Sequence, residues 1–409
     1  MTSETAPWPS DEISGHGLSG TNLEHARDHN QRVTLQAIRF NGPLSRLDLA
    51  RITGLTLPSI ANITKRLLET GLIVEETQRQ GKRGQPAKQI AINPDGCYSL
   101  GINIDRDHID LAVVDFAGRV RAQVKEEIGY AAPETAVAFI RRKLPELLAS
   151  GGIGRQKLIG AGVAIPDELG RLEPPSQRPD SYREWQNADI RELMAEELSL
   201  PIFVENDAAA AAIGELQFGD GAKAGSYFYI FIGVGLGGGL VLNGSSFRGG
   251  DGRSGEIGFL PVASTDPKVH CLADIVSIAA IHDRLAARDI HVAEPGDLLN
   301  LDASGTEVIE TWLDEATSHL TDVLASITCL INPDTVFIGG RLPLKLAARL
   351  TDMLNKALAA RMTRFPFVPQ IRAASRAEDA AVLGAAVLPM SALFLPNETA
   401  LLKSQGPVR

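Results

Sequence analysis

Two patterns of apolar residues divide this chain of 409 residues. In the first part, apolar residues recur at spacings of three and four, as on one face of a helix, and Ile60, Ile63 and Leu67 give the clearest example. From residue 99 onward, short continuous apolar runs bounded by glycine or charged residues alternate with longer helical stretches. The chain is therefore predicted to consist of a small helical module followed by an α/β body.

Capping and turn residues order the helices of the module. The helical stretch Arg32–Phe40 ends at an Asn-Gly-Pro turn. Ser45 is placed to cap a short helix through residue 53, and Asp48 stands three residues on, as in a capping box. Gly54 allows a sharp turn before Thr56, which caps the next helix. This order predicts a helix–turn–helix, whose second helix enters the major groove of DNA.

The second helix carries a polar face opposite its apolar stripe. On that face we expect the residues that contact DNA, namely Thr56, Ser59, Asn62 and Arg66. Asn62 and Ser59 are the candidates for contacts with base edges, because an asparagine side chain can bind adenine through two hydrogen bonds.

A basic hairpin follows the helices. Leu72–Val74 and Ala87–Asn93 are predicted strands, and the glycine-rich loop between them carries Arg79, Lys82 and Arg83, which we expect to contact phosphates. Residues 21–95 hold 11 Lys and Arg against seven Asp and Glu, a net charge of +4, whereas the whole chain carries −10. The basic charge of the module and the order of its helices and hairpin favour a winged helix–turn–helix that binds DNA. The alternative is a small helical docking domain with an incidental basic hairpin.

The body is predicted from two similar series of strands. Residues 99–104, 109–115 and 120–126 are predicted strands, followed by a helix over 135–149, kinked or restarted at Pro145, and a buried strand over 157–166. Strands over 227–232, 238–242 and 335–340 repeat this series. The weak duplication resembles the actin-like, ribonuclease H-like superfamily and predicts two lobes that face each other across a ligand-binding cleft.

Five segments carry a resemblance to a known family. They are the Glu-Asn-Asp-Ala segment at 205–208, the glycine loop 233–239, the Gly-Glu-Ile-Gly segment at 255–258, the segment 332–340 and the helix 380–386. In this order behind a winged helix, they resemble the ROK family (repressors, open reading frames and sugar kinases), in particular its repressor branch. The resemblance covers the chain from about residue 22 to about residue 395.

The resemblance implies a division into domains. A disordered arm over residues 1–20 precedes a winged helix–turn–helix domain over 21–95. A two-lobe sugar-binding domain occupies 96–395, with lobe I formed by 96–206 and the C-terminal helix 376–395, and lobe II formed by 207–375. Residues 396–409 form a tail.

A sugar site is also implied by the resemblance. In the sugar kinases of the family, the aspartate of the Glu-Asn-Asp motif, here Asp207, acts as general base toward a sugar hydroxyl. Asn206 and Glu256 match other hydroxyl-binding positions, and Asp274 follows Ala273, which stands where the family carries a further glutamate. We expect Asn206, Asp207, Glu256 and Asp274 to bind the ligand. As an alternative, Asp207 only caps the helix over 208–215.

The residues that serve phosphoryl transfer in the family's kinases are altered. Asn103 stands in place of an aspartate on the first strand, Arg106 lies in the segment that replaces a glycine turn, and Val234 replaces a threonine of the glycine loop. These changes, in the first strand with its turn and in the glycine loop, affect the side that binds the nucleotide. We therefore expect no enzyme activity and no cofactor, and Asp207 is catalytic only if kinase activity survives.

The structural zinc site of many family members is altered as well. Phe259 stands at the position of the zinc-binding histidine, and the cysteine cluster is reduced to the segment 266–272, which contains only His270 and Cys271. One cysteine and one histidine do not complete a four-ligand site, so no metal is expected. Phe259 is expected to pack into the space left.

These observations predict a sugar-responsive transcriptional regulator, a repressor of genes for carbohydrate metabolism or transport. Its partners are operator DNA, a sugar or sugar phosphate, and a second copy of itself in a homodimer or tetramer. Three widely spaced cysteines and no apolar run of membrane-spanning length fit a cytoplasmic protein without a membrane partner. The alternatives are an active ROK sugar kinase with an appended DNA-binding domain, and a regulator controlled by a protein partner, with a vestigial pocket.

Overall fold

A computed structural model describes residues 23–77, 88–167, 169 and 179–396 of the chain. These residues fall into two units. The larger unit holds residues 67–74 and 92–393, and the smaller one holds the remaining residues of the N-terminal module together with the chain from residue 394.

Three helices and a two-stranded sheet form the N-terminal module: α1 (Leu23–Asn41), α2 (Arg46–Thr53), α3 (Leu57–Glu69), β1 (Ile73–Thr77) and β2 (Lys88–Ile92). Leu44 pairs with Ile90 of β2 through backbone hydrogen bonds of 2.9 and 2.8 Å. Ile38, Leu49 and Ile60, one from each helix, are buried, as the apolar spacing predicts. The module has the element order of a winged helix–turn–helix, and α1 begins well before the predicted residue 32.

The first sheet of the larger unit has the order β5-β4-β3-β6-β7. Its strands are β3 (Tyr98–Ile104), β4 (His108–Asp115), β5 (Val120–Glu127), β6 (Leu158–Ile165) and β7 (Ile202–Asn206). β3, β4 and β5 are antiparallel neighbours, whereas β6 and β7 run parallel to β3. We call this sheet with its helices the first lobe.

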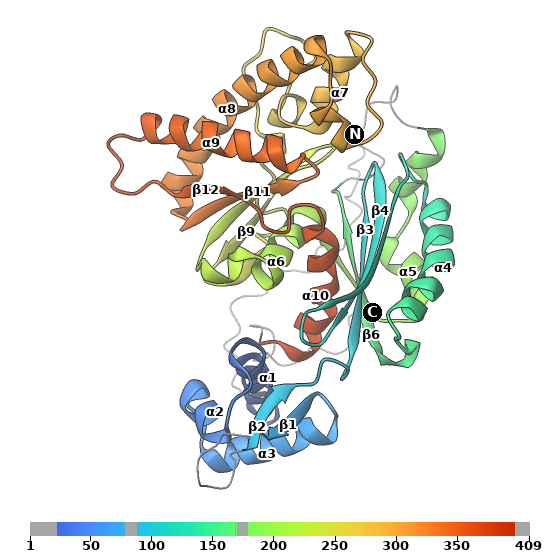
Figure 1. Ribbon diagram of the computed structural model, residues 1–409, viewed down its shortest axis with the longest axis vertical. Helices are drawn as coiled ribbons and strands as arrows, with labels where there is room; N and C mark the ends of the chain where they lie inside the picture. Colours follow the sequence, from blue (N-terminus) through green and yellow to red (C-terminus); the bar gives the residue numbers. More distant parts are fainter. Residues whose placement is uncertain (1–22, 78–87, 168, 170–178, 397–409) are drawn as a thin grey trace, which may run out of the picture. The chain divides into compact units, whose positions relative to one another are not determined.

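The second sheet repeats the first, with the order β10-β9-β8-β11-β12. Its strands are β8 (Tyr227–Ile232), β9 (Leu236–Leu242), β10 (Ser245–Phe247), β11 (Thr335–Gly340) and β12 (Gln370–Ala373). Again three antiparallel strands are extended by two parallel ones. The predicted duplication and the two-lobe α/β body are confirmed, and we call the second sheet with its helices the second lobe (Figure 1).

Helices cover each sheet (Figure 1). α4 (Pro133–Ser150) and α5 (Ile190–Leu198) pack on the first, and α9 (Leu344–Arg361) packs on the second, with α8 (Ala303–Ile331) and α7 (Ile278–Ala286) beyond it. Helix α4 runs on through Pro145, so the predicted restart there is wrong. Short 3-10 turns lie at Arg155–Lys157, Asp180–Asn187, Asp220–Lys223, Ile257–Phe259, Leu272–Asp274 and Pro295–Leu299.

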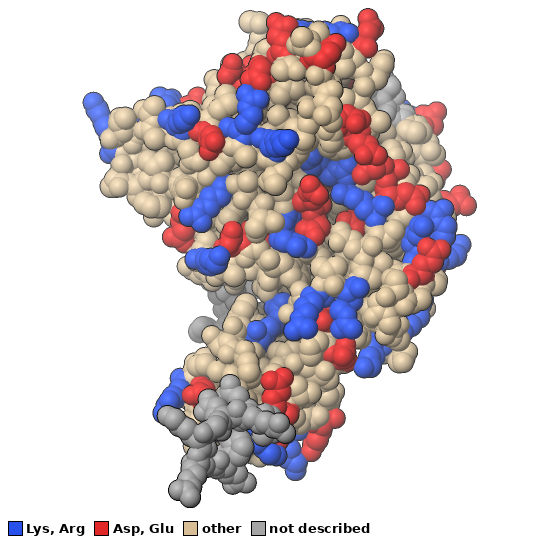
Figure 2. Space-filling model, viewed as in Figure 1, with Lys and Arg blue, Asp and Glu red and all other residues tan. Residues whose placement is uncertain are grey.

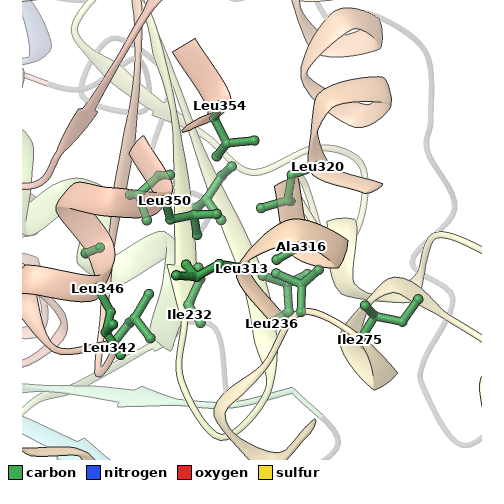
Figure 3. Close-up of a cluster of buried hydrophobic side chains, with 14 of the residues drawn as sticks. Ile232, Leu236, Ile275, Leu313, Ala316, Leu320, Leu342, Leu346, Leu350 and Leu354 are labelled. Carbon is green, nitrogen blue, oxygen red and sulfur yellow. The ribbon is translucent and has the colours of Figure 1, made fainter. Parts of the chain in front are cut away.

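The interior of the second lobe is apolar, whereas basic and acidic side chains are interspersed on the face drawn in Figure 2. In Figure 3, Leu313 and Leu320 of α8 lie beside Leu350 of α9 and Ile232 of β8. These leucines recur along their helices at helical spacing and are fully buried, so packing against the sheet stabilises both helices.

Two further helices, α6 (Asp207–Phe218) and α10 (Ala380–Phe394), make contact through glycines. A Cβ atom on Gly384 of α10 would lie 1.7 Å from the carbonyl oxygen of Ala210 in α6, and one on Gly162 of β6 would lie 1.8 Å from the carbonyl oxygen of Ala385. Helix α10 therefore packs its backbone directly against both α6 and the first sheet (Figure 1). This packing fixes the start of α6, where the ligand-binding residues are predicted.

Candidate functional site

The turn between α2 and α3 has the caps that the sequence predicts. The Ser45 hydroxyl accepts a hydrogen bond from the Asp48 N–H at 3.2 Å, and the Asp48 carboxylate accepts one from the Ser45 N–H at 3.3 Å. Gly54 has a φ of +71°, in the left-handed region that favours glycine. Thr56 Oγ1 accepts a hydrogen bond from the Ser59 N–H at 3.4 Å. These contacts set the direction in which α3 begins.

The exposed face of α3 differs in part from the predicted one. Thr56 and Asn62 are exposed, whereas Ser59 and Arg66 are half-buried. Lys65 is exposed three residues after Asn62, and the sequence prediction did not include it although this spacing was the available signal. The exposed polar face of α3 is therefore centred on Asn62 and Lys65, with Ser59 and Arg66 at its margins.

Ion pairs join β1 and β2, the two strands of the wing, to each other and to α2. The Glu75 carboxylate of β1 accepts hydrogen bonds from the Arg46 guanidinium at 2.8 Å and from the Lys88 ammonium at 2.7 Å. The predicted phosphate-binding residues of the wing lie outside the described residues: Arg79, Lys82 and Arg83.

A cavity of about 320 Å³ lies in the larger unit where β7 runs into α6. All four predicted ligand-binding residues line it: Asn206, Asp207, Glu256 and Asp274. They come from the end of β7, the first turn of α6 and two short 3-10 turns, so residues distant in the sequence are brought to one place.

Asn206, rather than Asp207, caps helix α6. Its side-chain oxygen accepts hydrogen bonds from the N–H groups of Ala208 and Ala209 at 2.9 and 3.1 Å, and its amide nitrogen donates to Glu256 at 3.1 Å. The alternative that Asp207 is the helix cap is therefore wrong, since Asp207 is already the first helical residue. The cap orients Asn206 and, through it, Glu256.

Asp207 and Glu256 are both shifted toward the protonated form. Burial, and secondly the nearby Asp105 carboxylate, raise the pKa of Asp207 to about 7. Burial and the neighbouring Asp167 raise the pKa of Glu256 to about 7. Arg106 opposes both shifts without cancelling them. The cavity therefore holds carboxyl groups that titrate near neutral pH.

Asp274 lines the cavity, but its carboxylate already has backbone partners. One of its oxygens accepts hydrogen bonds from the N–H groups of His270 and Cys271, at 2.8 and 3.0 Å. This arrangement caps the turn at Leu272–Asp274. Asp274 is therefore the least available of the four candidates for a ligand hydroxyl.

Phe259 does not fill an interior space. Its side chain is 52% exposed and lines the cavity together with His270 and Cys271. The expectation that Phe259 packs into the space of a zinc site is therefore wrong, because its side chain is exposed at the cavity while its neighbours Ile257 and Gly258 are buried. An aromatic ring at the edge of the cavity instead offers a face on which a sugar ring can stack.

The altered kinase positions stand beside the cavity. Asn103 is buried, with its amide nitrogen 3.1 Å from Nε2 of His108. Arg106 and Val234 line both this cavity and two neighbouring ones of about 590 and 940 Å³. A charged side chain and an apolar one thus stand where the three cavities meet.

Asp105 is a cavity residue that the sequence prediction missed. It is only 2% exposed and lines the cavity next to Arg106. The only signal was its place directly before the segment that replaces the family's glycine turn, and no sequence pattern placed it opposite Asp207.

An ion-pair network extends from this segment to the second lobe. Asp107, His108 and Asp105 have ligand atoms within 4.8 Å of one another, a spacing that suits a metal ion. However, Asp107 already pairs with His108 at 2.6 Å and lies 3.5 Å from the guanidinium of Arg341. Arg341 also pairs with Glu127 at 2.8 Å. The cluster is therefore an ion-pair network that joins the two lobes.

Trp185 serves the first lobe rather than the ligand. It is buried in the hydrophobic core of that lobe, and its indole N–H donates to the carbonyl of Ala131 at 2.8 Å.

A comparison with protein families identifies the body. A model described as the ROK family matches residues 99–391, most of the chain. The chain belongs to the ROK family. A second model, described as a winged helix-turn-helix DNA-binding domain, matches residues 27–74 of this ROK protein.

Curated relatives of this ROK protein bear the names of regulators. The xylose repressor of Bacillus spizizenii is 27% identical over 59% of this chain and 62% of its own length. The DNA-binding transcriptional dual regulator NagC of Escherichia coli is 24% identical over 85% of this chain and 90% of its own.

A solved structure shares the fold over most of the chain. It is described as a ROK family transcriptional regulator, a homologue of the E. coli MLC protein, and it superposes with a TM-score of 0.68 at 23% identity, covering 90% of this chain and 97% of that one. Within the part of this ROK protein that the structure describes, every helix is too short or too polar to span a membrane.

Proposed function

We propose that this ROK protein is a sugar-responsive transcriptional regulator, which represses genes of carbohydrate metabolism or transport. The observation that carries the proposal is the presence in one chain of a winged helix–turn–helix and a carboxylate-lined cavity in a ROK body. Relatives that match over most of their length are named as regulators, which supports this function over that of a sugar kinase. DNA binding implies that the protein acts in the cytoplasm.

DNA is bound by the exposed face of α3 together with the wing. Asn62 is exposed in the middle of α3, where an amide can bind a base edge, and Lys65 beside it can pair with a phosphate. Thr56, Ser59 and Arg66 lie around them and complete the surface. Because the half-sites of such operators are paired, the active form is a homodimer or a multiple of it.

A sugar is bound by acceptors that are fixed before it arrives. Asn206 is held by its helix cap and by Glu256, and among the described residues the Asp207 carboxylate accepts a hydrogen bond from the N–H of Ala208 alone, at 2.7 Å. Asp207 offers lone pairs that suit the vicinal hydroxyl groups of a sugar, and Glu256, which is also hydrogen-bonded to Asp167, binds beside it. Asp274 also lines the cavity and contributes through the oxygen that its backbone partners leave unused.

Ligand binding controls DNA affinity through the angle between the lobes. The cavity is lined by residues of both lobes, for example Asp105 and Leu236. A ligand that contacts both lobes favours one closure state. The change in DNA affinity is limited by how much more tightly the ligand binds that state than the other.

The first experiment measures DNA binding and its response to sugars. Operator sequences are selected from random DNA by the purified protein, and gel-shift affinity is then measured with and without a panel of pentoses and hexoses. A selected repeat of half-sites whose affinity changes with one sugar is expected. If no sequence is enriched, the proposed function is wrong; sugar-dependent ATP hydrolysis would instead support a kinase.

A further inference from the structure

The cavity holds an excess of carboxylates. Among the described residues, its titratable lining consists of one arginine, one histidine, one cysteine and five acidic residues, which are Asp105, Asp167, Asp207, Glu256 and Asp274. Burial and a second carboxylate raise the pKa values of Asp207 and Glu256 to about 7. Among the described residues that line the cavity, acidic side chains therefore outnumber basic ones.

One of these carboxylates has an unused, buried oxygen. Asp105 Oδ1 accepts a hydrogen bond from the N–H of Arg106 at 2.7 Å. Its other oxygen, Oδ2, is buried and has no hydrogen-bond partner among the described residues. A Cβ atom on Gly233 would lie 3.7 Å from this oxygen, which places Oδ2 against the glycine loop that borders the cavity. A buried carboxylate oxygen without a partner is costly unless a ligand supplies a donor.

Two arginine side chains at the cavity, Arg106 and Arg253, already pair with acidic residues that line it. The Arg106 guanidinium lies 3.9 Å from Asp105 Oδ1, and Arg253 lies 3.8 Å from Asp167 with half of its side chain exposed. Neither places a donor on Asp105 Oδ2. Among the described residues, none supplies a donor to this oxygen, so a donor on a ligand can occupy that place.

We propose that the cavity binds a carbohydrate that carries a protonated amino group, an amino sugar or aminocyclitol, with Asp105 as the residue that pairs with the ammonium. The inference rests on the proposed function, since it names the ligand class of the same cavity. The hydroxyl groups of the ligand bind Asp207 and Glu256, and its ammonium group supplies the charge and the donor that Asp105 lacks.

A sugar phosphate fits this cavity less well. A phosphate brings up to two further negative charges to a site that has five acidic residues and one arginine. The first turn of α6 does not offer its N–H groups to an anion either, because Asn206 already accepts hydrogen bonds from those of Ala208 and Ala209. A neutral sugar brings no charged donor to Asp105 Oδ2.

The test compares matched ligands on the full-length protein. Thermal unfolding and calorimetric titration are measured with neutral hexoses, 2-amino-2-deoxyhexoses and hexose 6-phosphates, each in the gluco, galacto and manno configurations, and with amino-inositols beside inositol. At least one amino compound is expected to bind about 10- to 100-fold more tightly than its neutral counterpart, as a charged hydrogen bond predicts. Tighter binding of a neutral or phosphorylated member would overturn the inference and leave the proposed function intact. If no compound binds, both the inference and the proposed sugar site in this cavity are overturned.

Two variants assign the effect to Asp105. Asp105→Asn keeps the shape and the acceptor for the Arg106 N–H, so it should remove the preference for the amino compound while neutral sugars bind within about threefold of wild type. Asp352→Asn, an exposed aspartate on α9, is the control for charge alone and should change nothing. If Asp105→Asn fails to fold, Asp105→Ser, which also removes the charge, serves instead, and a preserved preference in the folded variant overturns the assignment.

The pH dependence gives an independent readout. Asp207 faces Asp105, Arg106 and Glu256, and Glu256 faces Asp167, Arg253 and Arg106, so a bound ammonium group lowers the pKa of both carboxyls and releases protons. Affinity for the amino compound should therefore rise between about pH 5.5 and about pH 7. An affinity for the amino compound that is flat over this range would contradict the inference. Divalent cations alone, tested in parallel with a chelator, must not stabilise the protein in an Asp105-dependent way.

Discussion

At the scale of single residues, Asp207 makes the stability of the unliganded protein depend on pH. Its pKa rises from 3.8 in the unfolded chain to about 7 in the folded protein, because burial and then Asp105 disfavour the charged form. Between these pH values the folded protein binds more protons than the unfolded chain. The contribution of this group to the free energy of unfolding therefore decreases as the pH rises from about 4 to about 7.

Replacing Asp207 with asparagine should remove this penalty. Asparagine keeps an oxygen for the Ala208 N–H. We expect Asp207→Asn to raise the free energy of unfolding by about 1–3 kcal/mol at about pH 8 and to leave it unchanged near about pH 4. Urea unfolding of both proteins at the two pH values tests this, with Asp352→Asn as control. A variant that is less stable than wild type at the higher pH would contradict the pKa assignment.

Single residues on α3 should separate base recognition from phosphate binding. Asn62→Ala should cost about 1–3 kcal/mol of specific DNA-binding free energy. Lys65→Ala should weaken binding to all DNA sequences alike and reduce the slope of log affinity against log salt concentration by about one. Both side chains are exposed, so the melting temperature should not change. Gel shifts on the selected operator and on unrelated DNA at several salt concentrations measure both effects. Lys356→Ala on α9 is the control, and equal losses on all DNA for Asn62→Ala would rule out a base contact.

At the scale of elements, the contact of α10 with α6 supports the cavity from behind. It depends on the absence of a side chain at Gly384, where a Cβ atom would lie 1.7 Å from the Ala210 carbonyl oxygen. Because backbone atoms of two packed helices cannot move apart cheaply, α10 leaves no room for alanine there. The position of α6, and with it of Asn206 and Asp207, depends on this contact.

Gly384→Ala should therefore destabilise the larger unit by about 3 kcal/mol and weaken ligand binding, since α6 must shift. Gly296→Ala is the matched control, because a Cβ atom there would have no neighbour within 4 Å. It should be neutral or slightly stabilising. Urea unfolding followed by tryptophan fluorescence measures both variants. Equal stability of the two would show that α10 tolerates the displacement.

At the scale of the whole molecule, Arg341 links the two lobes. It follows the last residue of β11, and its side chain, only 7% exposed, pairs with Glu127 at 2.8 Å and lies 3.5 Å from Asp107. Both acidic residues belong to the first lobe. Loss of a buried cation leaves these carboxylates without compensation.

Arg341→Ala should lower the free energy of unfolding by about 3 kcal/mol and change the ligand affinity, because closure of the lobes loses one of its contacts. Arg349→Ala is the control, since Arg349 pairs with Glu310 at 2.6 Å while about half of each side chain is exposed. Its cost should stay below about 1 kcal/mol. Urea unfolding and calorimetric titration measure both variants. A similar small cost for both would show that Arg341 is not a link between the lobes.

Features that depend on neighbours in the chain were predictable. The caps of α2 and α3 involve residues three positions apart. The strands of both sheets are marked by continuous apolar runs, and such a run is a pattern of neighbouring residues. Predictions failed where a contact from elsewhere decided the outcome. Helix α4 continues through Pro145. The cap of α6 is Asn206, and Phe259 lies at the cavity edge instead of inside. The predicted domain boundaries remain predictions.

By itself, the sequence determined the elements, the duplication, the winged helix–turn–helix and the family, because periodicity, caps and motif order are properties of neighbouring residues. It also named four residues that meet in one cavity. Only the tertiary structure decided which charges meet there. Asp105 and Asp207 are distant in the chain but adjacent in space, and their burial and mutual repulsion set the pKa of Asp207. Coulomb interactions depend on distance and burial, which are fixed only when the lobes are folded against each other.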